Sequence, residues 1–150
     1  MQLLHRHRRP AVLIGSATVL AVVAISASAA VSRGAADSEI AVTLGKPSEL
    51  GMKMSAMSAK AGEVAFKVRN RGKLAHEFIL LRTSTPAAKL KPQAEDPQKV
   101  VEPGFLAELE DITPGHKVIL ALPLHKGHYV LLCNIAGHHA AGMRADLVLK

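Results

Sequence analysis

The sequence is poor in cysteine and in aromatic residues. Its 150 residues include one cysteine, Cys133, one tyrosine, three phenylalanines and no tryptophan. A single cysteine excludes a disulfide within the chain, so the fold must be held by a hydrophobic core alone. The thiol has three possible roles: a buried apolar filler, an unpaired reactive group or a metal ligand. Taken alone it favours the filler, because free cysteine packs like a small hydrophobic side chain.

Acidic residues are also scarce, with 12 Asp and Glu against 19 Lys and Arg, a formal net charge of +7. Three of the basic residues, Arg6, Arg8 and Arg9, lie in the first nine positions, and the remaining excess is mild and spread along the chain. A nucleic-acid-binding domain usually shows a clustered basic face, so we expect no nucleic-acid partner. A basic surface would instead steer the protein towards an acidic redox partner.

Charge is absent from Ala11–Val31, a run rich in Ala, Val, Leu and Ile that follows the basic residues 1–9. This order directs a segment into a membrane and leaves its start on the cytoplasmic side. Ala27-Ser28-Ala29 suits a signal peptidase, but the run is also just long enough to span a bilayer. We therefore predict that residues 1–31 are an apolar helix serving as a signal peptide or N-terminal membrane anchor. The rest would work outside the cytoplasm, in the periplasm or on the outer face of the cytoplasmic membrane.

After a polar linker at residues 32–38, apolar residues recur at every second position, as in half-buried strands. Residues 39–150 are predicted to form one domain, an all-β antiparallel Greek-key β-sandwich of seven or eight strands. Residues 83–104 contain four prolines and are predicted to form a long irregular excursion with one short helical turn. The predicted strands are residues 40–44, 50–54, 64–68, 76–81, 106–112, 117–122, 128–133 and 145–149.

The most informative stretch is residues 133–143, Cys-Asn-Ile-Ala-Gly-His-His-Ala-Ala-Gly-Met, which places a thiol, an imidazole and a thioether at steps of five. Two histidines, one cysteine and a weak axial methionine suit copper in both of its oxidation states. Gly137 and Gly142 allow the loop to bend so that its ligands converge. His76 supplies the second histidine from a strand that could lie beside the one ending at Cys133.

These motifs resemble those of the blue copper proteins, the cupredoxin family that includes plastocyanin, azurin, rusticyanin and auracyanin. The likeness rests on Cys-x4-His-x4-Met and on Asn-x-Gly-x3-His-Glu-Phe at residues 70–78, and it covers about residues 38–150. It implies a cupredoxin-like fold and one copper ion per chain, which cycles between Cu(I) and Cu(II). His76, Cys133 and His138 would be equatorial ligands and Met143 the axial one. The protein would be a monomeric one-electron carrier, not an enzyme, serving a redox protein such as a cytochrome or an oxidase.

Some residues near the motifs need separate interpretation. Many relatives carry Asn or Ser after the first histidine, where this chain has Glu77, and we expect its carboxylate to point away from the thiolate. His139 could compete with His138, but the five-residue step favours His138. The remaining histidines of the domain are expected to be solvated: His116, His125 and His128.

Two other functions remain open. Met52, Met54 and Met57 resemble thioether sites for Cu(I), which would suit a copper-handling protein that stores or delivers the metal in the cell envelope. The simpler interpretation is that Met52 and Met54 face the core. A multicopper oxidase domain fits badly, because the chain is short and its only His-x-His is His5–His7 in the leader. By family likeness, His138 would approach the surface through a patch of small residues: Ala136, Gly137, Ala140, Ala141 and Gly142.

Overall fold

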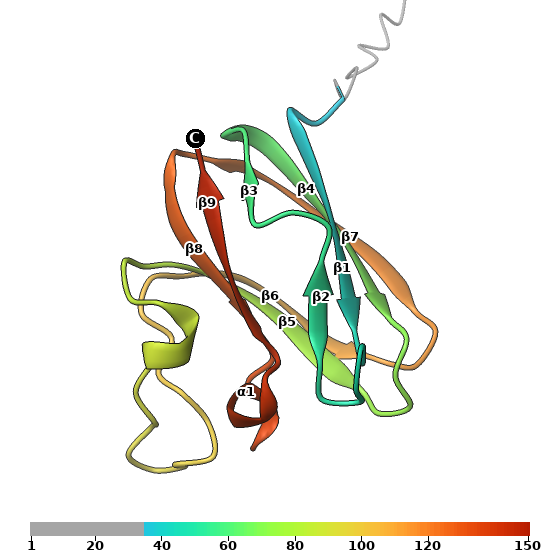
Figure 1. The fold of residues 1–150 in the computed structure, drawn as a ribbon, viewed down its shortest axis with the longest axis vertical. Helices are drawn as coiled ribbons and strands as arrows, with labels where there is room; N and C mark the ends of the chain where they lie inside the picture. The colour runs from blue at the N-terminus through green and yellow to red at the C-terminus, as the bar shows by residue number, and fades with distance from the viewer. Residues whose placement is uncertain (1–34) are drawn as a thin grey trace, which may run out of the picture. The chain divides into compact units, whose positions relative to one another are not determined.

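The computed structural model describes residues 35–150, so the predicted leader and residues 32–34 of the linker lie outside the described residues. Within them, no helix is long and apolar enough to cross a bilayer. The described chain forms nine strands, one 3-10 helix and one short α-helix (Figure 1). The strands are β1 (Ser38–Leu44), β2 (Met52–Met54), β3 (Ser58–Ala59), β4 (Gly62–Asn70), β5 (His76–Arg82), β6 (Phe105–Ile112), β7 (Lys117–Leu124), β8 (Gly127–Leu132) and β9 (Arg144–Leu149).

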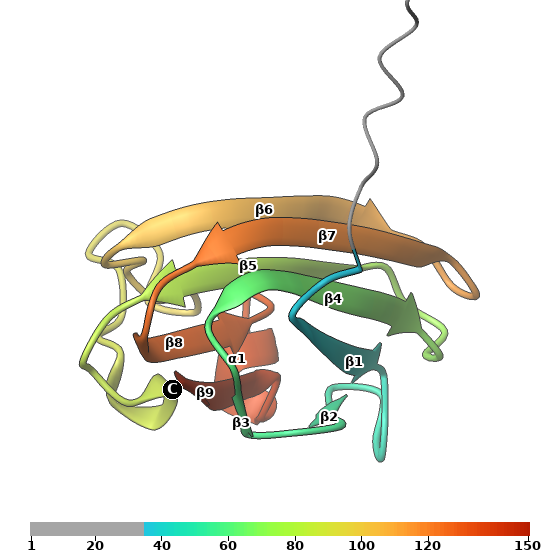
Figure 2. The same cartoon turned by 90° about the horizontal axis from the view of Figure 1, so that it is seen from above.

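The strands form two sheets, with the orders β2-β1-β4-β7 and β3-β9-β8-β5-β6 (Figure 2). The prediction of a purely antiparallel sandwich was wrong, because β1 pairs with β4 in parallel and β3 pairs with β9 in parallel. Both pairs join strands that are not consecutive in the chain, so no tight hairpin forces them to run in opposite directions. The other pairings are antiparallel, and the mostly β class is confirmed.

Each of the eight predicted strands overlaps a strand of the structure, because their alternating apolar residues form the interior of the sandwich. Phe66 of β4 and Phe78 of β5 meet there with ring centroids 5.4 Å apart, and neither is exposed. β3 was missed, since a two-residue strand of Ser and Ala carries no hydrophobic period. The core therefore accounts for the sheets without any disulfide.

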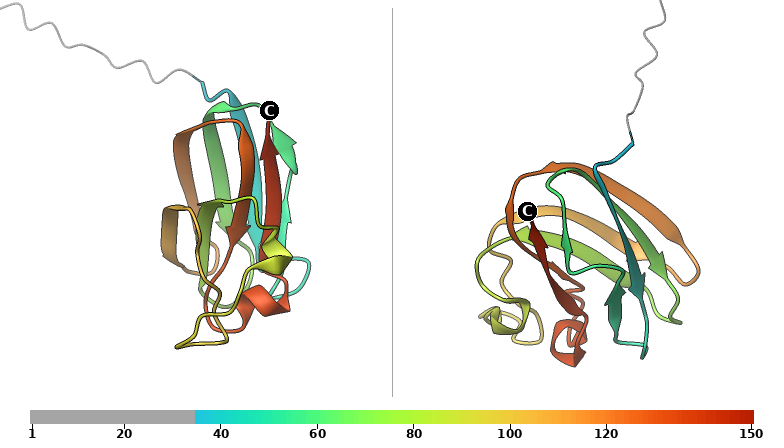
Figure 3. Two further views of the ribbon diagram at one scale, coloured as in Figure 1. Left: turned by 90° about the vertical axis from the view of Figure 1, so that its left-hand side faces the viewer. Right: turned by 45° about the horizontal axis from the view of Figure 1, so that its top comes forward.

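Two irregular segments lie at the end of the sandwich opposite the C-terminus (Figures 1 and 3). One is the excursion at residues 83–104, whose predicted helical turn is confirmed as the 3-10 helix η1 (Ala87–Lys89). The other is the loop between β8 and β9, which contains α1 (His138–Ala141), a helix that was not predicted. Figure 3 shows the two segments side by side at this end. α1 begins with His138, one of three predicted ligands that lie close together.

Candidate metal centre

Three of the four predicted ligands form one compact cluster. A nitrogen of each imidazole and the Cys133 sulfur all lie within 4.8 Å of one another, and all three side chains are buried. His76 Nδ1 is 3.4 Å from His138 Nδ1, which in turn is 3.3 Å from Cys133 Sγ. Metal bonds of about 2.0–2.3 Å hold donor atoms roughly 3–4 Å apart, so the spacing suits a shared ion.

Backbone hydrogen bonds shape the loop that carries Cys133 and His138. The Cys133 N–H donates to the Met143 carbonyl at 3.0 Å, and the Met143 N–H donates to the His138 carbonyl at 3.0 Å. Gly137 and Gly142 flank α1 with φ of 81° and 118°, values that side chains with a Cβ rarely adopt. The expected bends at both glycines are therefore confirmed.

Met143, the predicted axial ligand, follows this loop and is fully buried. Its side chain belongs to the same cluster of buried residues as Cys133. The hydrogen bond between their backbones thus brings Cys133 and Met143, the first and last predicted ligands of the loop, close together.

His76 is the first residue of β5 and has no exposed surface. Beyond its ring, Glu49 of the loop between β1 and β2 has a carboxylate oxygen 3.4 Å from His76 Nε2. The same carboxylate accepts the backbone N–H groups of Lys73 and Leu74, at 2.8 and 2.9 Å. These two hydrogen bonds hold the pKa of Glu49 below its ordinary value, and the bond from Leu74 has the larger effect.

The environment favours neutral imidazoles. Burial lowers the pKa of His76, and the nearby Glu49 carboxylate opposes that shift. Burial also lowers the pKa of His138, with a further decrease from His76. A neutral imidazole has a free lone pair, which a metal ligand requires.

Cys133 is enclosed, and burial raises the pKa of its thiol. The backbone N–H of Glu77 points at the sulfur at 3.3 Å and opposes that shift. A thiolate here is therefore unfavourable by itself but has a hydrogen-bond donor aimed at it, so a bound cation would stabilise it. Two imidazoles and one thiolate in a closed pocket are the donors that copper prefers, and the residues fit that ion.

Glu77 contacts the site through its backbone N–H on the Cys133 sulfur, and the expectation that its carboxylate points away from the thiolate stays a prediction. The negative charge of its carboxylate contributes to the raised pKa of the Cys133 thiol. Burial raises the pKa of Glu77 itself, against the opposing effect of Lys99. The backbone of Glu77 thus links the two segments that carry the predicted ligands.

The excursion is tied to the ligand loop by several hydrogen bonds. The buried Asn134 amide exchanges two of them with the backbone of Val100, both at 2.9 Å, and donates a third to Glu102 at 2.6 Å. His139 is buried with its Nε2 2.9 Å from the Ala87 carbonyl, so it faces η1 and not the cluster. Sequence reasoning missed Asn134 and Glu49, because their partners are distant in the chain and no local motif marks the contact.

With this geometry in place, comparison with known families is decisive. The model of the sulfocyanin (SoxE) domain matches residues 16–150, which is most of the chain. The chain belongs to the sulfocyanin family. Sulfocyanins are cupredoxins, blue copper proteins that carry single electrons, and the cofactor is one copper ion per chain. No curated protein sequence matches the chain.

Solved structures support the same fold. Auracyanin B aligns with a TM-score of 0.57 and 18% identity, over 78% of this chain and 91% of its own. Rusticyanin from Thiobacillus ferrooxidans aligns with a TM-score of 0.60 and 16% identity, over 77% of this chain and 79% of its own. Auracyanin from Roseiflexus castenholzii aligns with a TM-score of 0.52 and 20% identity, over 78% of this chain and 99% of its own. At these identities, the likeness shows a shared fold.

The other predicted residues lie outside the cluster. Met52 and Met54 pack partly against the core, as expected, whereas Met57 is 69% exposed. His116 and His125 are exposed. His128 is not simply solvated, because its Nε2 lies 2.9 Å from a carboxylate oxygen of Asp146.

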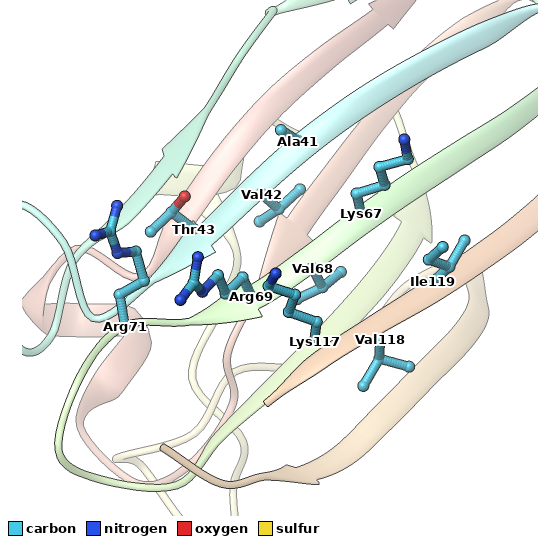
Figure 4. Close-up of a pocket in the computed structure, with 10 residues that line it drawn as sticks. All are labelled: Ala41, Val42, Thr43, Lys67, Val68, Arg69, Arg71, Lys117, Val118 and Ile119. Carbon is cyan, nitrogen blue, oxygen red and sulfur yellow. The ribbon is translucent and has the colours of Figure 1, made fainter. Parts of the chain in front are cut away.

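A separate hollow of about 380 Å³ lies on the outer face of the β2-β1-β4-β7 sheet (Figure 4). None of the predicted ligands lines it, and none of its lining residues is aromatic. The basic residues that line this hollow come from β4, from the turn after β4 and from β7. The pairing of β4 with β7 places them on one face of the sheet. These residues are Lys67, Arg69, Arg71 and Lys117.

Proposed function

We propose that this sulfocyanin is a one-electron carrier outside the cytoplasm, with copper held by His76, Cys133, His138 and Met143. The observation that carries the proposal is the convergence of two imidazoles and one thiol within 4.8 Å. His76, Cys133 and His138 would be the equatorial ligands, and Met143 the weak axial one. Four protein ligands leave no open position for a substrate, which argues against catalysis.

The residues around the copper support electron transfer more than copper release. His76 and Cys133 have no exposed surface, and their segments are joined through Glu77. A site fixed in this way keeps its geometry when copper gains or loses an electron, so little has to move. His138 has 8% of its surface exposed and is the ligand through which a partner would exchange electrons.

The direct test is to add Cu(II) to the purified domain. We expect an intense visible charge-transfer band that is lost in Cys133→Ser, because the band requires the thiolate. His139→Ala serves as the matched control and should keep the band, since His139 faces Ala87. No band in the unmodified domain, or an unchanged band in Cys133→Ser, would reject the proposed ligand set.

The partner is proposed to be a redox protein, such as a cytochrome or an oxidase, that meets a monomer at the small-residue patch around α1. Ala136, Ala140 and Ala141 of this patch are exposed. Ala140→Glu should slow electron exchange with the partner without bleaching the copper, and an unchanged rate would count against the patch. The basic hollow supports an acidic partner, because opposite charges steer association.

The position outside the cytoplasm rests on residues 1–31, proposed to be a signal peptide or a membrane anchor. The N-terminal residue of the mature protein, determined by sequencing, would distinguish the two. A start after residue 27 would indicate cleavage, whereas the native start would indicate an anchor.

A copper-handling role is the second candidate, favoured by Met52, Met54 and Met57. Met52, Met54 and Met57 line one surface hollow beside Arg144 and Asp146, which makes a thioether site sterically feasible. Ready transfer of Cu(I) to a chelator, lost in the Met52→Leu, Met54→Leu double variant, would favour this role. Slow release together with reversible one-electron cycling would favour the carrier.

A further inference from the structure

The side of His76 that faces away from the proposed copper ligands is enclosed by a loop from the other sheet. Residues 45–51 join β1 to β2, and the Gly45 N–H closes this loop on the Gly51 carbonyl at 2.9 Å. A Cβ at Gly45 would lie 2.4 Å from the Gly72 backbone, so the loop rests directly on the turn before His76. This packing brings Glu49 to the metal centre although it belongs to neither ligand motif.

The Glu49 carboxylate lies where His76 needs a hydrogen-bond acceptor. Among residues 35–150, His76 Nε2 is the one buried side-chain nitrogen or oxygen without a hydrogen bond of good geometry. Glu49 Oε1 is 3.4 Å away, at the outer limit of such a bond, and is fixed by the N–H groups of Lys73 and Leu74. An acceptor on this side keeps the ring proton on Nε2 and leaves Nδ1 free for the metal.

Gly72 leaves room for this contact. A Cβ at this position would lie 2.3 Å from Glu49 Oε1 and 3.1 Å from His76 Nε2. The Gly72 backbone has no positive φ, so the need for glycine here comes from space and not from backbone conformation. The glycine of the Asn-x-Gly-x3-His motif thus serves the carboxylate–imidazole pair in this chain.

We propose that Glu49 is a positioning residue of the copper centre, which orients His76 through Nε2 and lowers the reduction potential through its negative charge. The inference rests on the proposed function, because it takes His76 as a ligand. An anionic group beyond a ligand favours Cu(II) over Cu(I), and its effect is moderated here because the Glu49 side chain is 34% exposed. A merely structural Glu49 would hold the turn at Lys73 and leave the potential unchanged.

Three variants separate charge from orientation. Glu49→Gln removes the charge but keeps an oxygen that can accept the Nε2 proton. Gly72→Ala keeps the charge but displaces the carboxylate, and Glu49→Ala removes both functions. Glu39→Gln is the matched control, since Glu39 is an exposed carboxylate paired with Lys67 at 2.6 Å on β1 and β4.

The measurement is the midpoint potential of the copper-loaded protein by voltammetry. In Glu49→Gln we expect the blue band to persist and the Cu(I)/Cu(II) equilibrium to shift towards Cu(I) on the order of tenfold, about 59 mV for a one-electron couple. Gly72→Ala should shift the midpoint potential in the same direction, and Glu39→Gln should leave the midpoint potential unchanged. Equal potentials for Glu49→Gln, Gly72→Ala and Glu39→Gln would overturn the proposal.

A second measurement uses the copper-free protein, so it does not depend on the proposed function. Nitrogen-15 NMR of the His76 ring should show the proton on Nε2 in the unmodified protein and a mixture of tautomers in Glu49→Ala. The same tautomer in both would overturn the positioning role. Absence of a blue band in the unmodified protein would reject the proposed function, while the NMR result would still decide whether Glu49 orients His76.

Discussion

The two halves of the metal centre are held in different ways. The strand half consists of His76 and Glu77 at the start of β5, and it is fixed by the sheet and by Glu49. The loop half, residues 133–143, includes only four helical residues. It is held by its own backbone hydrogen bonds and by the excursion, through the Gly137 N–H on the Gln98 carbonyl at 2.9 Å.

This difference assigns different tasks to the two halves. The sheet already determines the backbone of the strand half, and this half carries one proposed ligand, His76, which has no exposed surface. The loop half carries the other three proposed ligands, of which Cys133 and Met143 are fully buried and His138 is 8% exposed. The proposed partner would approach at His138. The excursion fixes the loop half through hydrogen bonds, because the loop contains little regular structure of its own. A long irregular segment of this kind can therefore be part of a metal centre.

The largest expected effect comes from removing each histidine in turn. His76→Gly and His138→Gly should both lose the blue band completely in the presence of Cu(II). Added imidazole should restore the band in His138→Gly, because that ring reaches the surface, and not in His76→Gly, whose ring is enclosed. Visible spectra during an imidazole titration check this. Equal recovery in both variants would show that the two halves are equally accessible.

The second-largest effect is expected on the stability of the protein, from loss of the hydrogen bonds between the excursion and the loop half. Asn134→Ala removes three hydrogen bonds of a buried amide and leaves the Val100 N–H without an acceptor, so it should cost about 1–3 kcal/mol of stability. Urea unfolding of the copper-free protein measures this. Gln93→Ala is the matched control, because Gln93 donates to the same Val100 carbonyl at 3.0 Å from within the excursion. A larger loss in the control would mean that the excursion folds independently of the loop.

A smaller change is expected at the end of the loop half. Met143→Leu should keep the blue band, because the equatorial ligands remain, and should raise the reduction potential. The lost thioether leaves three ligands, a number that suits Cu(I), and the shift should be about tenfold, or roughly 59 mV. Voltammetry checks it, and a lower or unchanged potential would argue against axial ligation by Met143.

The pattern of the loop half could be predicted from the sequence, whereas the contacts that support the two halves could not. Cys133, His138 and Met143 form a local pattern, because one loop carries them at fixed steps. Asn134 and Glu49 act on partners far along the chain, and an Asn or a Glu in a turn carries no mark of that contact. Their roles emerge only when the excursion and the loop at residues 45–51 are placed in space.

The fold shows the same division. Alternating apolar residues predicted every strand except β3, since the period depends only on which side chains are buried. The period says nothing about the direction of a neighbouring strand, so the parallel β1–β4 pair was not foreseen. The contact of Glu77 with the site could not be predicted, because it joins a backbone N–H to the Cys133 sulfur 56 residues away.

The smallest expected effect is that of a substitution at Asp37, just before β1 and remote from both halves of the metal centre. It serves as a reference for the larger effects above. The Asp37 carboxylate accepts the Glu63 N–H at 3.0 Å, and this bond, with the Lys60 charge, holds the pKa of Asp37 below its ordinary value. Its contribution to stability is therefore present above the pKa of the unfolded chain and is lost as the pH falls through the folded-state pKa. Asp37→Asn should be slightly less stable at neutral pH and equal to the unmodified protein in strong acid.

Urea unfolding of the copper-free protein at several pH values measures this difference, with Glu95→Gln, another carboxylate replacement, as the control. The reduction potential of Asp37→Asn should equal that of the unmodified protein, because the substitution touches neither half of the metal centre. A shift in potential as large as that of Glu49→Gln would mean that any loss of negative charge changes the copper equilibrium. In that case the effect of Glu49 could not be attributed to its position beside His76.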